Sequence, residues 1–177
     1  MKAVVIYNSK TGFTEKYAKW IAEELGCKAQ SIDKTKEADI VPCDCVIYGG
    51  WLMASGINGL KRLKKMRALN GKRVFVFAVG VSDMDMPGLH DKIVEMNFSP
   101  EERLMAPVFY FEGGINYEKM GFMSKKMLGM LKKNVGKKEV ISAEESNLLD
   151  KISRDYDGTK REYIEPLIEI VKETCER

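Results

Sequence analysis

The sequence predicts an α/β fold in which a doubly wound, five-stranded parallel sheet carries helices on both faces. Short apolar runs rich in β-branched residues alternate along the chain with segments whose apolar residues recur at helical spacing. This alternation is expected when parallel strands are joined by helical crossovers. The chain has 177 residues, of which 45% are hydrophobic, so a single domain can bury a core of ordinary size. We therefore expect residues 1–177 to form one domain.

Five segments have the composition of parallel strands. Residues 2–7 (K-A-V-V-I-Y) form a short, β-branched apolar run of the kind that is buried on both faces of a sheet. The remaining strands are expected at residues 28–32, 45–49, 72–79 and 106–111. Residues 28–32 are polar enough for an edge of the sheet, whereas residues 72–79 are apolar enough for its centre.

Helical spacing fills the connections between these strands. Residues 14–25 place an apolar stripe on one face, and residues 56–67 and 91–96 form the helices of two later crossovers. The stripe of the first helix consists of Tyr17, Ala18, Ile21, Ala22 and Leu25.

Two capping boxes predict helices near the end of the chain. In the first box, Ser142 precedes Glu145 by three residues, and in the second, Thr159 precedes Glu162 by three. Pro166 lies inside the second helical pattern, so that helix either kinks or starts later than its box suggests.

The loop after the first strand is the most informative segment of the chain. It consists of Ser9, Lys10, Thr11, Gly12, Phe13 and Thr14. The loop ends at a helix N-terminus, where free backbone N–H groups and the positive end of the helix dipole favour an anion. It lacks the glycine patterns of nucleoside triphosphate and dinucleotide sites, and its hydroxyl groups are neutral donors. We interpret the loop as a cradle for a phosphate monoester on a small cofactor; the alternative is an ordinary turn with an N-cap hydroxyl.

Two further loops are expected to meet this cradle. In an open sheet of order 2-1-3-4-5, ligands sit beyond the carboxyl ends of the strands, between the first and third strands. Residues 49–59 and 80–87 follow strands that end there, and the indole of Trp51 suits stacking on a flat ring. The cofactor contacts expected from these loops are Gly50, Trp51, Leu52, Met53, Gly80, Val81 and Ser82.

The first loop resembles the FMN phosphate loop of flavodoxins, whose pattern is [ST]-x-[ST]-G-x-[ST]. The residues that fall on the phosphate-contacting positions of that family are Ser9, Thr11, Gly12 and Thr14. This resemblance implies a flavodoxin-like fold, FMN as the cofactor and electron transfer through a non-covalent flavin. Many flavodoxins stack a tyrosine on the flavin from the third loop, whereas residues 80–88 hold no aromatic side chain here.

A helical insert within or after the fifth strand is similar to one branch of the same fold. Residues 113–133, followed by residues 137–142, resemble the inserted segment of the flavodoxin-like, menaquinone-dependent protoporphyrinogen oxidases. The resemblance implies a methionine-rich helical insert at 113–138, a resumed strand at 139–141 and C-terminal helices within 142–177.

The methionines of this insert recur at three- and four-residue steps over residues 117–133, and lysines mostly occupy the other side. They are Met120, Met123, Met127 and Met130. The stripe either packs on the domain as core or forms an adaptable docking face for a quinone, a porphyrin or a redox protein. A basic amphipathic helix is also of the kind that rests on an anionic membrane surface.

Composition and charge exclude several classes of protein. The formal net charge is +3, which gives no reason to expect a nucleic-acid partner. No apolar stretch is long enough to span a bilayer, and the first strand occupies the place of a signal peptide. We therefore expect a cytoplasmic protein with at most peripheral membrane contact.

No metal site is expected. Cys43 and Cys45 form a C-x-C pair, but a metal would need further ligands, and the only histidine, His90, lies in another segment. Reduced thiols are the better interpretation of the four cysteines. The sequence shows no nucleophile triad and no paired carboxylates, so no catalytic residue is assigned.

Three functions remain open. The first is an FMN-binding electron carrier, against which the mildly basic charge argues, because carriers of this kind are usually acidic. The second is a flavin-dependent protoporphyrinogen oxidase or quinone-linked oxidoreductase. The third is a flavin-free interaction domain on the same fold.

Overall fold

A parallel sheet forms the centre of the molecule. The structure is a computed structural model that describes residues 2–103, 106–137 and 141–175. Within these residues, five strands run parallel in the order β2-β1-β3-β5-β6, which confirms the predicted order 2-1-3-4-5. They are β1 (Ala3–Asn8), β2 (Lys28–Ser31), β3 (Cys45–Met53), β5 (Arg73–Gly80) and β6 (Val108–Glu112). The polar β2 lies at an edge and β5 lies inside the sheet, as their compositions predict.

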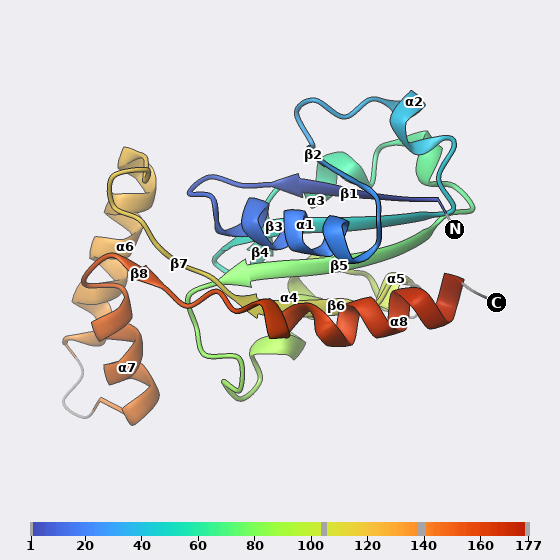
Figure 1. Ribbon diagram of the computed structural model, residues 1–177. Coiled ribbons are helices and arrows are strands. Elements are labelled where there is room, and N and C mark those ends of the chain that lie inside the picture. The colour runs from blue at the N-terminus through green and yellow to red at the C-terminus, as the bar shows by residue number, and fades with distance from the viewer. Residues whose placement is uncertain (1, 104–105, 138–140, 176–177) are drawn as a thin grey trace.

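One face of the sheet is covered by the first and last helices (Figure 1). They are α1 (Phe13–Glu24) and α8 (Glu165–Cys175). Because side chains alternate along a strand, Val5, Ile47 and Phe77 all point to this face. Tyr17 of α1 and Leu167 of α8 complete the layer, and both are fully buried.

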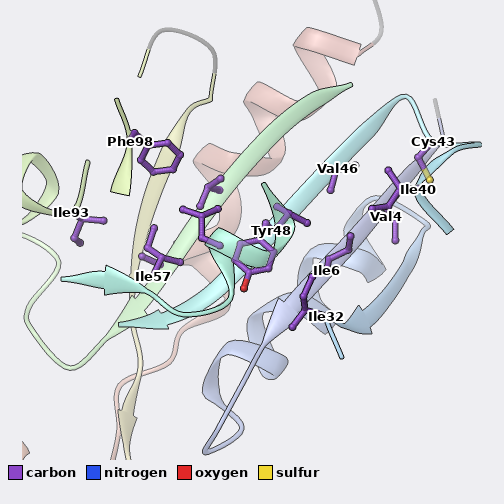
Figure 2. Packing of buried hydrophobic residues seen from close by; sticks show 14 of the residues in the cluster. Val4, Ile6, Ile32, Ile40, Cys43, Val46, Tyr48, Ile57, Ile93 and Phe98 are labelled. Atoms are coloured by element: carbon purple, nitrogen blue, oxygen red, sulfur yellow. The ribbon is translucent and has the colours of Figure 1, made fainter. Parts of the chain in front are cut away.

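The opposite face packs against shorter helices. They are α2 (Glu37–Ile40), α3 (Leu60–Leu63) and α4 (Leu89–Asn97), with a 3-10 turn η1 at Arg67–Leu69. A further short helix, α5 (Pro100–Arg103), follows α4 and has no buried residue. Figure 2 shows Tyr48 of β3 between Ile6 and Ile57 in this layer, with Ile93 and Phe98 farther along it. The sheet is therefore buried between two apolar layers, one on each face.

The segment after β3 differs from its prediction. Residues 56–67 were expected to be one helix, but β4 (Gly56–Ile57) folds back and pairs antiparallel with β3, so that α3 begins only at Leu60. The reversal needs positive φ at Ala54 (48°) and Ser55 (65°), a conformation that non-glycine residues rarely adopt. The side chain of Asn97 holds the turn, because its Oδ1 accepts the N–H of Ile57 at 2.8 Å.

Two helices, α6 of the insert and α7 of the C-terminal segment, lie next to each other beyond the ends of the strands (Figure 1). A short ribbon joins them to the sheet, with β7 (Gly114–Ile115) paired antiparallel to β8 (Tyr156–Asp157). The helices are α6 (Phe122–Val135) and α7 (Ala143–Lys151). α6 begins five residues later than predicted, since Tyr117 instead donates its N–H to Asp155 Oδ1 at 2.7 Å.

The two capping boxes have different outcomes. Ser142 Oγ accepts the N–H of Glu145 at 3.2 Å and starts α7, as predicted. The hydroxyl of Thr159 bonds to Asp157 instead, and α8 starts at Glu165 after a 3-10 turn η2 at Arg161–Ile164. Pro166 therefore lies in the first turn of α8, where its missing N–H costs nothing. The strand expected at 139–141 falls mainly on residues outside the described part of the chain.

No helix in the described part of the chain combines the length and the apolar character needed to cross a bilayer.

Candidate functional site

A cavity of about 400 Å³ opens beyond the carboxyl ends of β1, β3 and β5. Its volume is in the range of sites that hold small molecules. Ten of the thirteen residues predicted to contact a cofactor line it. They are Lys10, Thr11, Phe13, Thr14, Trp51, Leu52, Met53, Gly80, Val81 and Ser82. The three predicted loops therefore meet at the switch point of the sheet.

The first loop presents unpaired backbone donors to this cavity. Gly12 is the N-cap of α1 and has φ 103°, a left-handed conformation that favours glycine. The first bond of α1 runs from Lys16 N to Gly12 O at 2.9 Å, so the N–H groups of residues 13–15 have no acceptor within the helix. Free donors of this kind and the positive end of the helix dipole favour an anion over a cation.

Ser9 and Gly12 shape this loop and do not line the cavity. Ser9 Oγ accepts the N–H of Gly12 at 3.2 Å, which fixes the turn into α1. Thr14 is 1% exposed and Thr11 is half-buried, and both line the cavity. Thr11 and Thr14 are therefore the residues of this loop whose hydroxyl groups belong to the cavity lining.

The indole of Trp51 in the cavity wall is held by Asn8, at the end of β1, and by Lys10 of the first loop. Its Nε1 donates to Asn8 Oδ1 at 2.9 Å, and Lys10 Nζ lies 5.3 Å from the centroid of the indole. The hydrogen bond fixes the direction of the indole edge, and the cation lies over the electron-rich ring. The orientation of the indole in the cavity wall is thus fixed.

Lys10 also reaches across the cavity to the insert. Its Nζ donates to Ser124 Oγ of α6 at 2.8 Å, although the two residues are 114 positions apart in sequence. The cation of the first loop therefore connects the N-terminus of α1, the indole of Trp51 and the helix α6.

Gly50 has a structural role behind the cavity and does not line it. A Cβ atom at this position would lie 2.5 Å from Ile57 Cγ2 and 2.6 Å from the carbonyl oxygen of Asn58. The missing side chain is what allows β4 to fold against β3. Gly80 does line the cavity, and a Cβ atom there would meet the hydroxyl of Tyr110 at 3.0 Å.

The third loop is fixed by β6. Tyr110 donates its hydroxyl to the carbonyl oxygen of Ser82 at 2.8 Å, and Gly113 donates its N–H to Gly80 O at 2.6 Å. Burial raises the pKa of Tyr110 far above its ordinary value, so the phenol stays protonated and remains a donor. Residues 80–82 are therefore held in one position at the cavity edge.

Several lining residues were not predicted. Tyr110 lies in the strand predicted at residues 106–111, for which the sequence indicates no cofactor contact. The others from the insert and nearby turns include Ala54, Ser55, Leu89, Ile115, Met120, Ser124, Met127, Leu128 and Leu131. The three- and four-residue spacing of the insert was the one signal that pointed to a shared face, but it did not show what that face covers.

None of the four methionines of the insert lies in the core. Met123 and Met130 are 65% and 57% exposed, whereas Met120 and Met127 line the cavity. The buried residue of α6 is Val135. The interpretation of the stripe as core packing is therefore wrong, and α6 instead covers the cavity on one side.

Each of the four cysteines is a free thiol. Among the residues that the structure describes, no group of three His, Cys, Asp or Glu side chains is placed to hold a metal ion.

Comparison with known proteins gives one family and several similar structures. A family model described as a flavodoxin domain matches residues 4–141. No curated protein matches the chain. A solved flavodoxin from the domain Archaea is similar, with 15% identity over 87% of this chain and 100% of that chain, at a TM-score of 0.40. An NADPH-quinone reductase from P. pentosaceus has 14% identity over 72% of this chain and 92% of that chain, at a TM-score of 0.46. The flavodoxin of Megasphaera elsdenii has 19% identity over 61% of this chain and 82% of that chain, at a TM-score of 0.42.

Proposed function

Because this chain belongs to the flavodoxin domain family, we propose that it binds FMN in the cavity above the sheet and transfers electrons through this non-covalent flavin. The observation that carries the proposal is the cavity itself, which joins the N-terminus of α1 to the indole of Trp51. The flavin supplies the redox chemistry when it is bound, and the protein supplies binding, orientation and access.

The first loop fits a phosphate monoester. Its unpaired N–H groups at residues 13–15 and the hydroxyls of Thr11 and Thr14 are neutral donors, and Lys10 is the one cation of the loop. Such a donor set suits a dianion whose charge is spread over several oxygens. Thr11 and Thr14 are the side chains that we assign to the phosphate, with Ser9 and Gly12 holding the loop in shape.

The rest of the cavity fits a flat, largely apolar ring. Trp51 offers the face of its indole, and Leu52 and Met53 extend that wall. Gly80 and Val81 leave their backbone close to the space, and Tyr110 fixes the position of Ser82. This arrangement supports a role for the second and third loops in orienting the ring and excluding water from one side of it.

The test compares FMN with riboflavin, which lacks the phosphate. In the double variant Thr11→Val, Thr14→Val, we expect the affinity for FMN to fall about tenfold or more, because hydrogen bonds to a charged group are lost. Affinity for riboflavin should stay unchanged. Titration calorimetry or quenching of flavin fluorescence measures both.

The matched control is Thr174→Val, which changes the same atoms on α8, far along the chain from the cavity lining. It should bind both flavins as the unmodified protein does. A protein that binds neither flavin, or a double variant that holds FMN as tightly as before, would contradict the proposal.

A second candidate function is flavin-dependent oxidation or reduction of an apolar small molecule, such as a quinone or a porphyrin. Leu128 and Leu131 of α6 support it, because they place apolar side chains on the cavity where a protein partner would otherwise approach. We expect Leu128→Ser to raise the KM for a short-chain quinone while FMN stays bound. Met130→Ser should leave this KM unchanged, because Met130 is 57% exposed and does not line the cavity. An equal KM in both variants favours the electron carrier.

We also propose that residues 1–177 form one domain. α8 belongs to the same buried cluster as α1 and the sheet, and β8 pairs with β7 directly after β6. The insert is thus enclosed by segments that pack on the common core.

A further inference from the structure

The outer face of α6 carries exposed apolar side chains interleaved with lysines. Phe122, Lys126, Met130 and Lys133 follow one another at steps of four, four and three residues, so they share one side of the helix. Phe122 is 78% exposed, and Met130 is 57% exposed. Both lysines are exposed as well. We name these residues, together with Met123 (65% exposed), the outer face of α6.

This face is separate from the side of the helix that covers the cavity. Ser124, Leu128 and Leu131 point to the cavity, and they lie on the side of the helix away from Phe122 and Lys126. Exposed side chains of this size normally occur singly on a protein surface. A row of them on one helix that lies at the end of the molecule (Figure 1) indicates a contact surface.

All charged side chains of α6 are positive. α6 contains four lysines and no acidic residue. Lys126 and Lys133 form no ion pair with any residue in the described part of the chain. The surface is therefore complementary to an anionic partner.

The mixture of the two kinds of side chain identifies that partner. Lysine is depleted at protein–protein interfaces, whereas methionine and phenylalanine are enriched there. In an interfacial helix both kinds are favoured together, since apolar side chains enter the boundary between headgroups and acyl chains while lysine stems reach the lipid phosphates. Each lysine near an anionic bilayer adds attraction.

From these observations we propose that the outer face of α6 docks the protein peripherally on an anionic phospholipid bilayer. Phe122, Met123 and Met130 enter the interface, and Lys126 and Lys133 contact lipid phosphates. Met127 lies between this face and the cavity, because it is 39% exposed and also lines the cavity. Docking in this way brings the cavity edge close to the bilayer. The proposal does not depend on the identity of the cofactor.

The experiment is flotation of the full chain with phospholipid vesicles. We expect the protein to float with vesicles of equal parts phosphatidylcholine and phosphatidylglycerol, and not with phosphatidylcholine alone. Binding should weaken with salt, because lysine–phosphate attraction is screened. Each lysine contributes roughly a fivefold factor to the partition coefficient, so Lys126→Gln with Lys133→Gln should reduce it roughly 25-fold.

Matched controls separate this face from general charge and apolar exposure. Lys61→Gln with Lys65→Gln removes the same charge from the region of α3, and Met96→Ser removes a methionine that is 59% exposed, close to the 57% of Met130. Both controls should float as the unmodified protein does, whereas Met123→Ser with Met130→Ser should lower the partition coefficient about tenfold or more. Circular dichroism verifies that every variant is folded.

Three results would overturn the proposal. The first is the same partitioning with and without the anionic lipid. The second is an equal fall of the partition coefficient in the α6 variants and in their controls. The third is no vesicle binding together with a dimer that Met123→Ser, Met130→Ser converts to monomer, because the face would then contact a second copy of this chain.

Discussion

Lys151 of α7 bridges Asp83 of the third loop and Glu112 at the end of β6. Its Nζ donates to Asp83 Oδ1 and, at 2.5 Å, to Glu112 Oε1, and the residue is only 7% exposed. The hydroxyl of Tyr156 donates a hydrogen bond to the same oxygen of Glu112 at 2.6 Å. The C-terminal segment therefore fixes the loop that forms one edge of the cavity. The charge of Asp83 is compensated by this lysine, so it is not a free negative charge beside the cavity.

Replacing this lysine should destabilise the protein strongly. Lys151→Met leaves two carboxylates without their cation in a mostly buried site, and removal of one partner from such a pair costs about 3–5 kcal/mol. We expect the free energy of unfolding to fall by about 3 kcal/mol in urea denaturation. Lys172→Met on the exposed side of α8 is the control and should change stability by less than about 0.5 kcal/mol. Equal effects of the two variants would show that the bridge is not structural.

Stability should fall as the pH rises above about 10. Burial raises the pKa of three phenols well above the ordinary value, namely Tyr17, Tyr48 and Tyr110. Burial alone would lower the pKa of Lys151, but its bonds to Asp83 and Glu112 outweigh burial and raise it. Each of these groups keeps a proton in the folded state that the unfolded chain loses, so its contribution is complete below the unfolded pKa and is lost above it.

Alkaline titration measures this dependence. Each such group lowers the free energy of unfolding by about 1.4 kcal/mol per pH unit above its unfolded pKa. We expect the absorbance of the three buried phenolates to appear together with the loss of the circular dichroism signal. Full ionisation of all tyrosines while the protein stays folded would contradict the assignment.

The sheet and the first loop could be predicted from sequence because their signals are local. Apolar runs and helical spacing define the strands and crossovers, and the loop after β1 carries its hydroxyl groups within six residues. The hairpin at β4 could not be predicted, since it depends on positive φ at Ala54 and Ser55, which neither residue type indicates.

The contacts of the insert and of α7 with the loops of the sheet could not be predicted for a different reason. The contacts of Lys10 with Ser124 and of Lys151 with Asp83 join residues 114 and 68 positions apart. No periodicity along the chain encodes such pairs, because they depend on how the insert and α7 pack beyond the end of the sheet. The sequence showed the spacing of the methionines. It did not show which of them face solvent and which line the cavity.

Two glycines should respond in opposite directions to the same substitution. Gly12 has φ 103°, so Gly12→Ala forces a strained backbone and should lower the free energy of unfolding by about 1–2 kcal/mol. Gly129 lies inside α6 with no atom within 4 Å of a Cβ position, so Gly129→Ala should raise it by about 0.5–1 kcal/mol. Only Gly12→Ala should also weaken FMN binding. Thermal denaturation and FMN titration of both variants measure these effects. A change in the free energy of unfolding that has the same sign in both variants would contradict the conformational argument.

The emission of bound FMN should report the position of Trp51. An indole in contact with the flavin ring quenches flavin fluorescence, so Trp51→Phe should bind FMN more weakly and leave it more fluorescent. Asn8→Ala removes the acceptor of the indole N–H, a bond of 2.9 Å, and should give an intermediate emission because the ring can then turn. Trp20→Phe is the control, because Trp20 does not line the cavity. Trp20 lies on α1 and packs edge-on against Tyr17, with 5.4 Å between the ring centroids. If bound FMN were equally dark in all three variants, the second loop would not be the stacking wall.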